Sequence, residues 1–324
     1  MIADIRLQNF RSYHDDSFEF SPATNIIVGP NASGKTNLLE ALLMICQGQS
    51  YRSRDANLIM FSKPWARLDG HVPGASRSLK LVRQEGELCT KTLSINNKIV
   101  KRLTQAKSLP AVLFEPHHLL LFHEGPEARR DYLDDLLEQL YPTYTTLRRR
   151  YKRTLSQRNR LLKTRPRGLQ TQLFAWDVRL SELGGQIAGY RSLLLETINA
   201  KLADLYRTLS SSTVKTTAEY HSKLDRSQYS SQLLHKLQAS LAHDLERSFT
   251  SYGPHRDDLI IKLDGHSVEH SASRGEVRSL LLALKVIELE LFEGTYNSKP
   301  VLLLDDVFSE LDGARRQSLK NGYQ

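Results

Sequence analysis

The sequence has little cysteine: Cys46 and Cys89 are the only two, and neither stands in a CxxC or Cys/His spacing. A disulfide framework and a zinc site are therefore not expected. Long apolar runs are also missing, since none approaches the roughly 20 residues of a membrane-spanning helix. The first residues, MIADIRLQNF, alternate like a strand and lack the apolar core of a signal peptide. These absences favour a cytoplasmic protein without a membrane partner.

Acidic residues are missing from one stretch, which runs from Gln139 to Trp176. Its ten basic residues carry more positive charge than the net +9 of the whole chain. They are Arg148, Arg149, Arg150, Lys152, Arg153, Arg158, Arg160, Lys163, Arg165 and Arg167. A basic helix is most often a solvated face with paired charges, but this stretch holds no acidic partner. The other interpretation is sequence-independent contact with DNA phosphates. Its candidate residues are Arg148, Arg149, Arg150, Lys152 and Arg153, and both interpretations stay open.

Alternation of apolar and polar residues predicts several strands. A hairpin is expected over residues 2–7 and 18–20, and a small antiparallel sheet over 78–103. The continuous apolar run at 25–29 predicts a buried strand, and a second such run begins the segment VLLLDD, 301–306.

Helical spacing predicts a helix from Lys35 to about Cys46, and long amphipathic stretches dominate the chain from about 127 to 248. The expected fold class is α/β: a P-loop ATPase head of mixed sheet plus a small antiparallel sheet, with an inserted α-helical arm. The expected domains are a discontinuous head, 1–115 and 252–324, and the arm, 116–251.

The segment GPNASGKT matches the Walker A pattern and stands between a predicted strand and a predicted helix. Its glycines let successive backbone N–H groups point at phosphate oxygens, and the following helix directs its positive end at the same place. A lysine here reaches the β- and γ-phosphates, and the hydroxyl after it binds Mg²⁺. The candidate nucleotide-binding residues are Gly29, Pro30, Asn31, Ala32, Ser33, Gly34, Lys35 and Thr36.

The matching acidic motif is Asp305-Asp306, at the end of an apolar run. Asp305 is the candidate Mg²⁺ ligand together with Thr36, and Asp306 is the candidate for orienting the attacking water. The structural alternative is a solvated strand end, which the Walker A match makes the weaker interpretation.

The stretch SASRGEV begins a predicted helix with a capping box, in which Ser273 and Glu276 satisfy each other's backbone N–H groups. Gly275 is a poor choice for a first helical turn, so local structure does not explain it.

Taken together, the motifs follow the order of an ABC-type ATPase: Walker A, signature motif at 273–276, Walker B, and a D-loop at SELD, 309–312. Within that superfamily the chain resembles the RecF family over nearly its whole length. The resemblance rests on LQNFRSY (7–13), GPNASGKTNLLEAL (29–42), SYRS (50–53), FEP (114–116), ARRDYLD (128–134), YGPHRDDL (252–259), SRGE (273–276) and LLLDDVFSELD (302–312).

The resemblance implies a head like that of SMC proteins, with ATP and Mg²⁺ as cofactors and ATP-dependent homodimerisation on DNA. It implies work at single-strand gaps and gapped duplexes with RecO- and RecR-like mediators, recombinase loading, and support of the SOS response. Ser273 and Gly275 would contact the γ-phosphate held by the second subunit. Ser273, Arg274, Gly275, Glu276 and Asp312 would form the dimer interface.

The resemblance also places Arg11, with its neighbours Asn9 and Phe10, where related heads contact nucleotide, although an ordinary strand end explains them equally. YGPHRDDL has no physical role that the sequence reveals. Asp306 stands where most ABC ATPases have Glu, and RecF proteins share this Asp. Its shorter side chain predicts slow hydrolysis, assisted by Lys35, because water is positioned less well.

The chain ends twelve residues after Asp312, where family members continue with a further strand and a switch region. We therefore expect a fragment or truncated product, which leaves its ATPase competence open. The alternative function is a nucleotide-dependent scaffold that binds partner proteins, with hydrolysis lost or incidental. A transporter ATPase subunit is disfavoured by the basic helical insertion.

Overall fold

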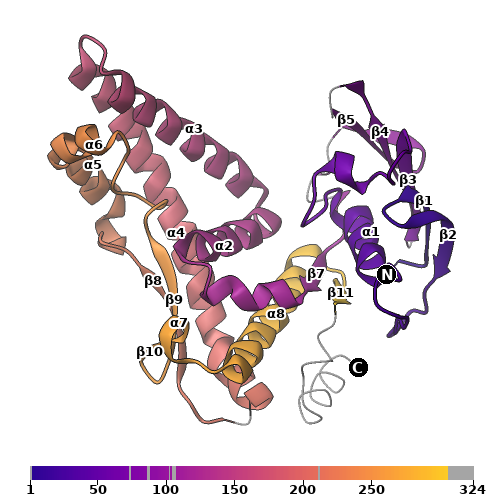
Figure 1. Ribbon diagram of the computed structural model, residues 1–324. Helices are drawn as coiled ribbons and strands as arrows, with labels where there is room; N and C mark the ends of the chain where they lie inside the picture. Colours follow the sequence, from indigo (N-terminus) through magenta and orange to yellow (C-terminus); the bar gives the residue numbers. More distant parts are fainter. Residues whose placement is uncertain are drawn as a thin grey trace. The chain divides into compact units, whose positions relative to one another are not determined.

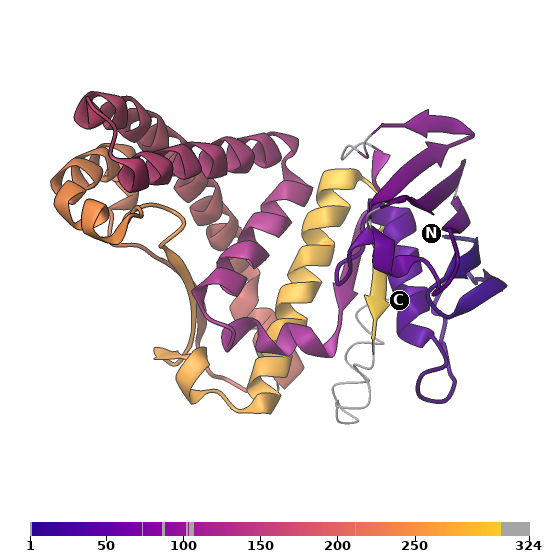
Figure 2. The same ribbon diagram turned by 45° about the horizontal axis from the view of Figure 1, so that its top comes forward.

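The structure is a computed structural model that describes residues 2–72, 74–85, 88–101, 103, 107–210 and 212–305. By contact it divides into two compact units. We call the residues up to Pro116 together with those from Glu288 to Asp305 the sheet unit, and His117–Ile287 the helical unit. Figures 1 and 2 show the elements of each.

The main sheet of the sheet unit is six-stranded and antiparallel, in the order β2-β1-β3-β4-β5-β6 (Figure 1). Its strands are β1 (Asp4–Phe10), β2 (Tyr13–Glu19), β3 (Trp65–Val72), β4 (Ala75–Arg83), β5 (Cys89–Ile95) and β6 (Lys98–Val100). In β1 the apolar residues Ile5 and Leu7 are fully buried while their neighbours are not, as the period of a strand requires. The predicted hairpin and antiparallel sheet are confirmed.

A second, two-stranded sheet is parallel and joins β7 (Ala111–Phe114) to β11 (Val301–Leu304). Next to these strands in the same unit is α1 (Lys35–Gln47), while the 3-10 helix η1 (Asp55–Leu58) lies against β4 and β5 of the main sheet. The apolar residues of α1, such as Leu38, Leu42 and Ile45, belong to the same core cluster as the inner residues of the main sheet. The predicted helix from Lys35 is therefore confirmed, and its apolar face explains why it packs there.

The predicted buried strand at 25–29 is wrong. These residues form no strand, and Ile26 and Val28 are 80% and 85% exposed. An apolar run becomes a buried strand only when other strands pair with its backbone, and no described strand pairs with this segment.

The helical unit is built from long helices and a small sheet (Figure 1). Its elements are η4 (Pro116–Phe122, whose first residue closes the sheet unit), α2 (Pro126–Leu140), α3 (Pro142–Thr164), α4 (Leu169–Ser210), β8 (Thr216–His221), η5 (Arg226–Gln228), α5 (Tyr229–Ala239), α6 (Leu241–Arg247), β9 (Asp258–Leu263), β10 (His266–Ser267), α7 (Val268–Ser271) and the first part of α8 (Arg274–Tyr296). None of the described helices combines the length and apolar character that a bilayer crossing requires.

Strand β8 lies inside the stretch that was expected to be helical, and it pairs antiparallel with β9. The purely helical interpretation of 127–248 therefore needs this correction. Because of such pairings, residues 252–287 belong by contact to the helical unit. The domain boundaries 1–115 with 252–324, and 116–251, stay a prediction.

The segment YGPHRDDL, 252–259, connects several elements of the helical unit through buried polar contacts. The hydroxyls of Tyr220 in β8 and Tyr229 in α5 donate to the Asp257 carboxylate, at 2.7 and 2.5 Å. Asp258 forms a bidentate ion pair with Arg129 of α2, at 2.9 and 2.8 Å. Asp257 and Asp258 therefore join β8, α5 and α2 to this segment, a role that the sequence did not reveal.

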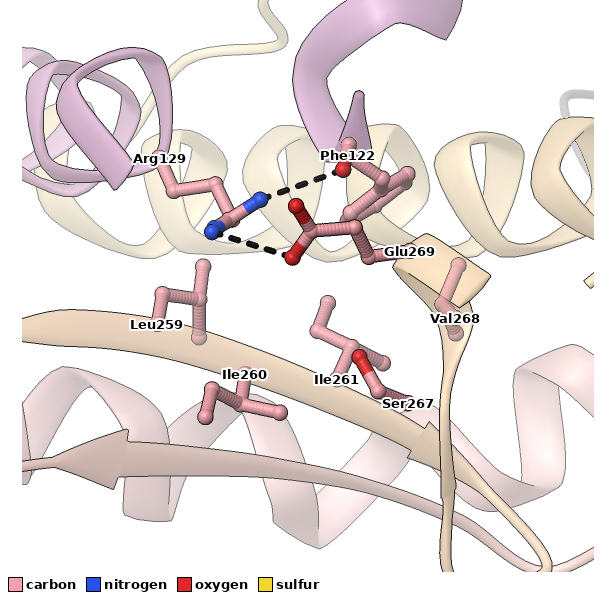
Figure 3. Close-up of a pocket in the computed structure, with 8 residues that line it drawn as sticks. All are labelled: Phe122, Arg129, Leu259, Ile260, Ile261, Ser267, Val268 and Glu269. Atoms are coloured by element: carbon pink, nitrogen blue, oxygen red, sulfur yellow. Dashed lines mark hydrogen bonds and ion pairs between the residues drawn. The ribbon is translucent and has the colours of Figure 1, made fainter. Parts of the chain in front are cut away.

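Arg129 also lines a small pocket between η4, α2, β9 and α7 (Figure 3). Its guanidinium donates to the carbonyl of Phe122 at 3.1 Å and pairs with Glu269 at 3.3 Å. The remaining walls are mostly apolar, with Leu259, Ile261 and Val268 among them. Arg129 therefore ties three segments together, and its buried charge is balanced by two carboxylates.

Candidate nucleotide-binding site

The Walker A loop leads directly into α1, whose first residue is Lys35. Gly34 has φ +98°, in the left-handed region that favours glycine, and a Cβ there would lie 2.9 Å from the Tyr13 hydroxyl oxygen. The Tyr13 hydroxyl instead donates to the Gly34 carbonyl at 3.1 Å. A residue larger than glycine would therefore disturb both the loop and its contact with β2.

The Lys35 ammonium lies against the loop and donates to the carbonyls of Gly29 at 2.9 Å and Pro30 at 2.8 Å. Residues 29–33 are exposed, so the loop is open to a ligand. The positive end of α1 and this ammonium together favour an anionic group, because backbone N–H groups at a helix start have no partners within the helix.

Thr36 and Asp305 are separated by 269 positions, and the fold brings them into contact: the Thr36 hydroxyl donates to Asp305 Oδ1 at 3.2 Å. Asp305 directly follows β11, and its N–H donates to the carbonyl of Phe114 at 2.9 Å. A hydroxyl and a carboxylate are the hard oxygen ligands that Mg²⁺ accepts, usually with phosphate oxygens and water completing its shell. In the described part of the chain no group of three His, Cys, Asp or Glu could hold a metal ion by itself. These two residues therefore fit a Mg²⁺ bound together with phosphate.

Behind the loop, the buried carboxylate of Glu40 in α1 collects four donors. Arg11 donates twice, at 2.9 and 3.0 Å, while Arg52 donates at 3.0 Å and Ser50 at 2.6 Å. Burial would raise the pKa of Glu40, but the hydrogen bonds from Arg11, Arg52 and Ser50 outweigh it, and the pKa lies below its usual value. Arg52 also donates to the Asn37 side chain at 2.8 Å.

The capping box of α8 is confirmed in the helical unit. The Ser273 N–H donates to Glu276 Oε2 at 2.7 Å, and the Glu276 N–H donates to Ser273 Oγ at 3.3 Å. Ser273 and Arg274 are exposed at the start of the helix, and Gly275 and Glu276 are partly exposed.

A family model described as "AAA domain" matches residues 4–250. The DNA replication and repair protein RecF of Agathobacter rectalis is 34% identical over 99% of this chain and 89% of its own length. The protein of the same name from Acetivibrio thermocellus is 35% identical over 97% of this chain and 88% of its own. The chain belongs to the RecF family. The resemblance drawn from the motifs is therefore confirmed.

Two solved structures have folds similar to that of this chain. One described as the recombination mediator protein RecF-ATP in the RecFOR pathway matches 100% of this chain and 89% of its own, with a TM-score of 0.86 and 30% identity. An Smc head domain from Pyrococcus furiosus matches with a TM-score of 0.52 at 14% identity, which supports the fold alone. The predicted fold class, an ABC- and SMC-like ATPase head of mixed α/β structure with a long helical segment, is confirmed.

Not every predicted site residue of this RecF homologue can be placed. Asp306 and Asp312 lie outside the described residues. Arg11 lies behind the loop, where its guanidinium holds Glu40 and its side chain is 20% exposed. Its neighbour Phe10 is fully buried in the core. The nucleotide contact expected at Arg11 stays a prediction.

The basic residues of α3 divide into two groups. Arg149, Arg150, Lys152 and Arg153 are exposed, as are Arg160 and Lys163 farther along the helix. Arg148 is 9% exposed and pairs with carboxylates of α2, at 2.6 Å to Asp131, 3.0 Å to Asp134, 2.8 Å to Asp135 and 3.0 Å to Glu138. The expectation of a DNA contact at Arg148 is corrected accordingly, because its charge is already neutralised inside the unit.

The sequence did not single out Glu40, Arg52, Tyr51 or Tyr13 as site residues. SYRS counted only toward the resemblance, and within LQNFRSY only Asn9, Phe10 and Arg11 were considered as contacts. A polar residue within the apolar face of a helix, such as Glu40 beside Leu38 and Leu39, was the available signal, because a buried carboxylate needs partners.

Proposed function

We propose that this RecF-family protein is an ATP-dependent DNA-binding protein of replication and recombinational repair. In this proposal it binds ATP and Mg²⁺ in the Walker A site, dimerises on DNA and hydrolyses ATP slowly. With RecO- and RecR-like mediators it helps load a recombinase at single-strand gaps, and so supports SOS induction. Its place of action is the cytoplasm, where chromosome and ATP are found.

The observation that carries the proposal is the contact of Thr36 with Asp305 beside the Lys35 ammonium. A hydroxyl, a carboxylate and an ammonium at a helix start are the groups that a nucleoside triphosphate with Mg²⁺ requires. The comparisons support the same proposal, since a relative of 30% identity is described as an ATP complex of a recombination mediator.

DNA binding is supported by the exposed cations of α3. For Arg149, Arg150, Lys152 and Arg153 no ion pair with a described carboxylate is found, so their charges are available to an anionic partner. Such contacts go to phosphates and carry no sequence preference, so we expect binding that weakens steeply as salt increases.

The test measures nucleotide affinity, dimerisation and DNA binding with ATP, ADP and no nucleotide, for the wild type and for Lys35→Ala. We expect ATP to promote dimerisation and DNA binding of the wild type, and Lys35→Ala to lose nucleotide binding and both effects. Ser273→Arg is the matched variant, because it should bind ATP normally and fail to dimerise with it. DNA binding and dimerisation that are the same with and without ATP would reject the ATP-gated mechanism.

A further inference from the structure

Tyr51 carries a polar atom that the described structure leaves unexplained. Its hydroxyl oxygen is buried and has no hydrogen-bond partner among the described residues. Most buried side-chain polar atoms in proteins have a partner, and an unsatisfied one destabilises the fold. A ligand that supplies the missing partner is one physical explanation.

The ring of Tyr51 is held in place from two sides. It is half-buried and packs against the core of the sheet unit. The Arg52 guanidinium lies 5.7 Å from the ring centroid, within the range of a cation–π contact. Arg52 is itself anchored on α1 through Asn37 and Glu40, which follow Thr36 within about one helical turn. The hydroxyl therefore has a fixed position relative to the start of α1.

Burial raises the pKa of Tyr51; the negative charges of Glu115, Asp305 and Glu40 raise it further, and the positive charge of Arg52 lowers it. Of these acids, Glu115 and Asp305 directly follow paired strands, since Phe114 of β7 lies opposite Leu304 of β11 in a parallel register. Parallel strands present their carboxyl ends at the same edge, where Asp305 meets Thr36. Tyr51 thus lies beside the edge where the Walker A loop and the β11 acid meet.

We propose that the Tyr51 hydroxyl is a further ligand-binding group of the nucleotide site, which donates a hydrogen bond to the γ-phosphate end of the bound ATP–Mg²⁺. Arg52 acts as a positioning residue that holds the phenol ring. The raised pKa keeps the hydroxyl protonated, so it is a donor at neutral pH. The inference rests on the proposed function, because it requires that ATP is bound at the Walker A loop.

The experiment compares Tyr51→Phe with the wild type, which removes one oxygen and keeps the ring. Without nucleotide, the melting temperature should stay the same or rise, because the lost hydroxyl had no partner. The Kd of ATP–Mg²⁺ should increase about tenfold, the size expected for a hydrogen bond to a charged group. The Kd values of ADP–Mg²⁺ and of ATP in EDTA should change little. Fluorescent-nucleotide titration and thermal unfolding give both quantities.

Tyr144→Phe is the matched control, since the Tyr144 hydroxyl is buried in the helical unit but donates to Asp134 at 2.6 Å. It should lower the melting temperature equally with and without ATP. If Tyr51→Phe lowers the melting temperature without nucleotide, or leaves the Kd of ATP–Mg²⁺ unchanged, the proposal is wrong. An unchanged Kd for Tyr51→Phe beside a lost affinity for Lys35→Ala would reject only the role of Tyr51. A wild type that binds no ATP would reject the proposed function as well.

Discussion

The two units bury charge in different ways. In the helical unit Arg158 of α3 is fully buried and pairs with Asp177 of α4 at 2.6 Å and with Asp244 of α6 at 2.7 Å. In the sheet unit the carboxylate of Glu40 is fully buried, but its partners Arg11 and Arg52 stay 20% and 34% exposed.

The difference indicates two uses of an ion pair. A guanidinium enclosed by two acids, the Thr250 hydroxyl and the Leu237 carbonyl can only hold the fold together, and it links α3 to α4, α5 and α6. The side chains of Arg11 and Arg52 are partly exposed and hold a carboxylate of the helix that follows the phosphate loop. We therefore expect buried charge to be structural in the helical unit and to support ligand binding in the sheet unit.

Removing the buried arginine should have the largest effect on stability. Arg158→Met leaves Asp177 and Asp244 buried without their cation, so we expect a loss of about 3–5 kcal/mol in the free energy of unfolding. Urea denaturation measures it, with Arg179→Gln as control, because the Arg179–Glu182 pair is exposed. Nucleotide affinity should remain at the wild-type value, and a parallel loss of ATP binding would contradict the separation of roles.

Glu40→Gln tests the buried charge of the sheet unit. Neutralising the carboxylate weakens its hold on Arg11 and Arg52, so we expect a loss of about 2 kcal/mol in stability together with weaker ATP binding. Asp15→Asn is the control, since Asp15 pairs with Arg6 at the exposed edge of the main sheet. Calorimetry with and without ATP separates the two effects. Lower stability with an intact ATP affinity would make Glu40 purely structural.

The free energy of unfolding should depend on pH through His255 of the YGPHRDDL segment. Burial lowers the pKa of His255 to about 4, and its ring contacts the Tyr151 hydroxyl at 2.6 Å. Between pH 6.5 and 4 the unfolded chain binds a proton that the folded chain does not, so this group makes stability fall as pH falls. The loss should reach about 2–3 kcal/mol near pH 4.

His255→Gln isolates that contribution, because the other titrating groups are common to both proteins. Among them, burial raises the pKa of Asp257, which acts in the opposite direction as pH falls. The difference in urea midpoint between the two proteins should shrink from pH 7 to pH 4. A difference that does not depend on pH would show that folding leaves the pKa of His255 unchanged, and a difference that grows as pH falls would show that folding raises it.

The smallest effect on stability is expected on the exposed face of α3. Arg149→Gln combined with Arg153→Gln should change the free energy of unfolding by less than about 0.5 kcal/mol. The same variant should weaken DNA binding and lower the slope of log affinity against log salt by about two. Arg148→Gln is the contrast on the same helix, because it should lower stability and leave the salt slope unchanged. If Arg148→Gln lowers the salt slope and the double variant does not, the DNA-binding surface does not lie on the exposed face of α3.

The sequence alone determined the elements that depend on neighbouring residues. The Walker A loop, the capping box at Ser273 and Glu276, and the antiparallel strands follow from turn residues and from the periods of helix and strand. The order of the ATPase motifs indicated an ABC-type ATPase, and the resemblance of segments such as YGPHRDDL and SRGE to the RecF family indicated the family.

Tertiary structure alone decided which charges are used up and which remain available. Arg148 and Arg149 are adjacent in one acid-free stretch, yet the acids of α2 neutralise only Arg148. The exposure of the apolar run at 25–29 and the missing hydrogen bond of the Tyr51 hydroxyl were likewise not visible in the sequence, since both depend on whether a distant segment supplies a partner. The physical reason is that burial and pairing are properties of contacts across the fold, which local patterns do not contain.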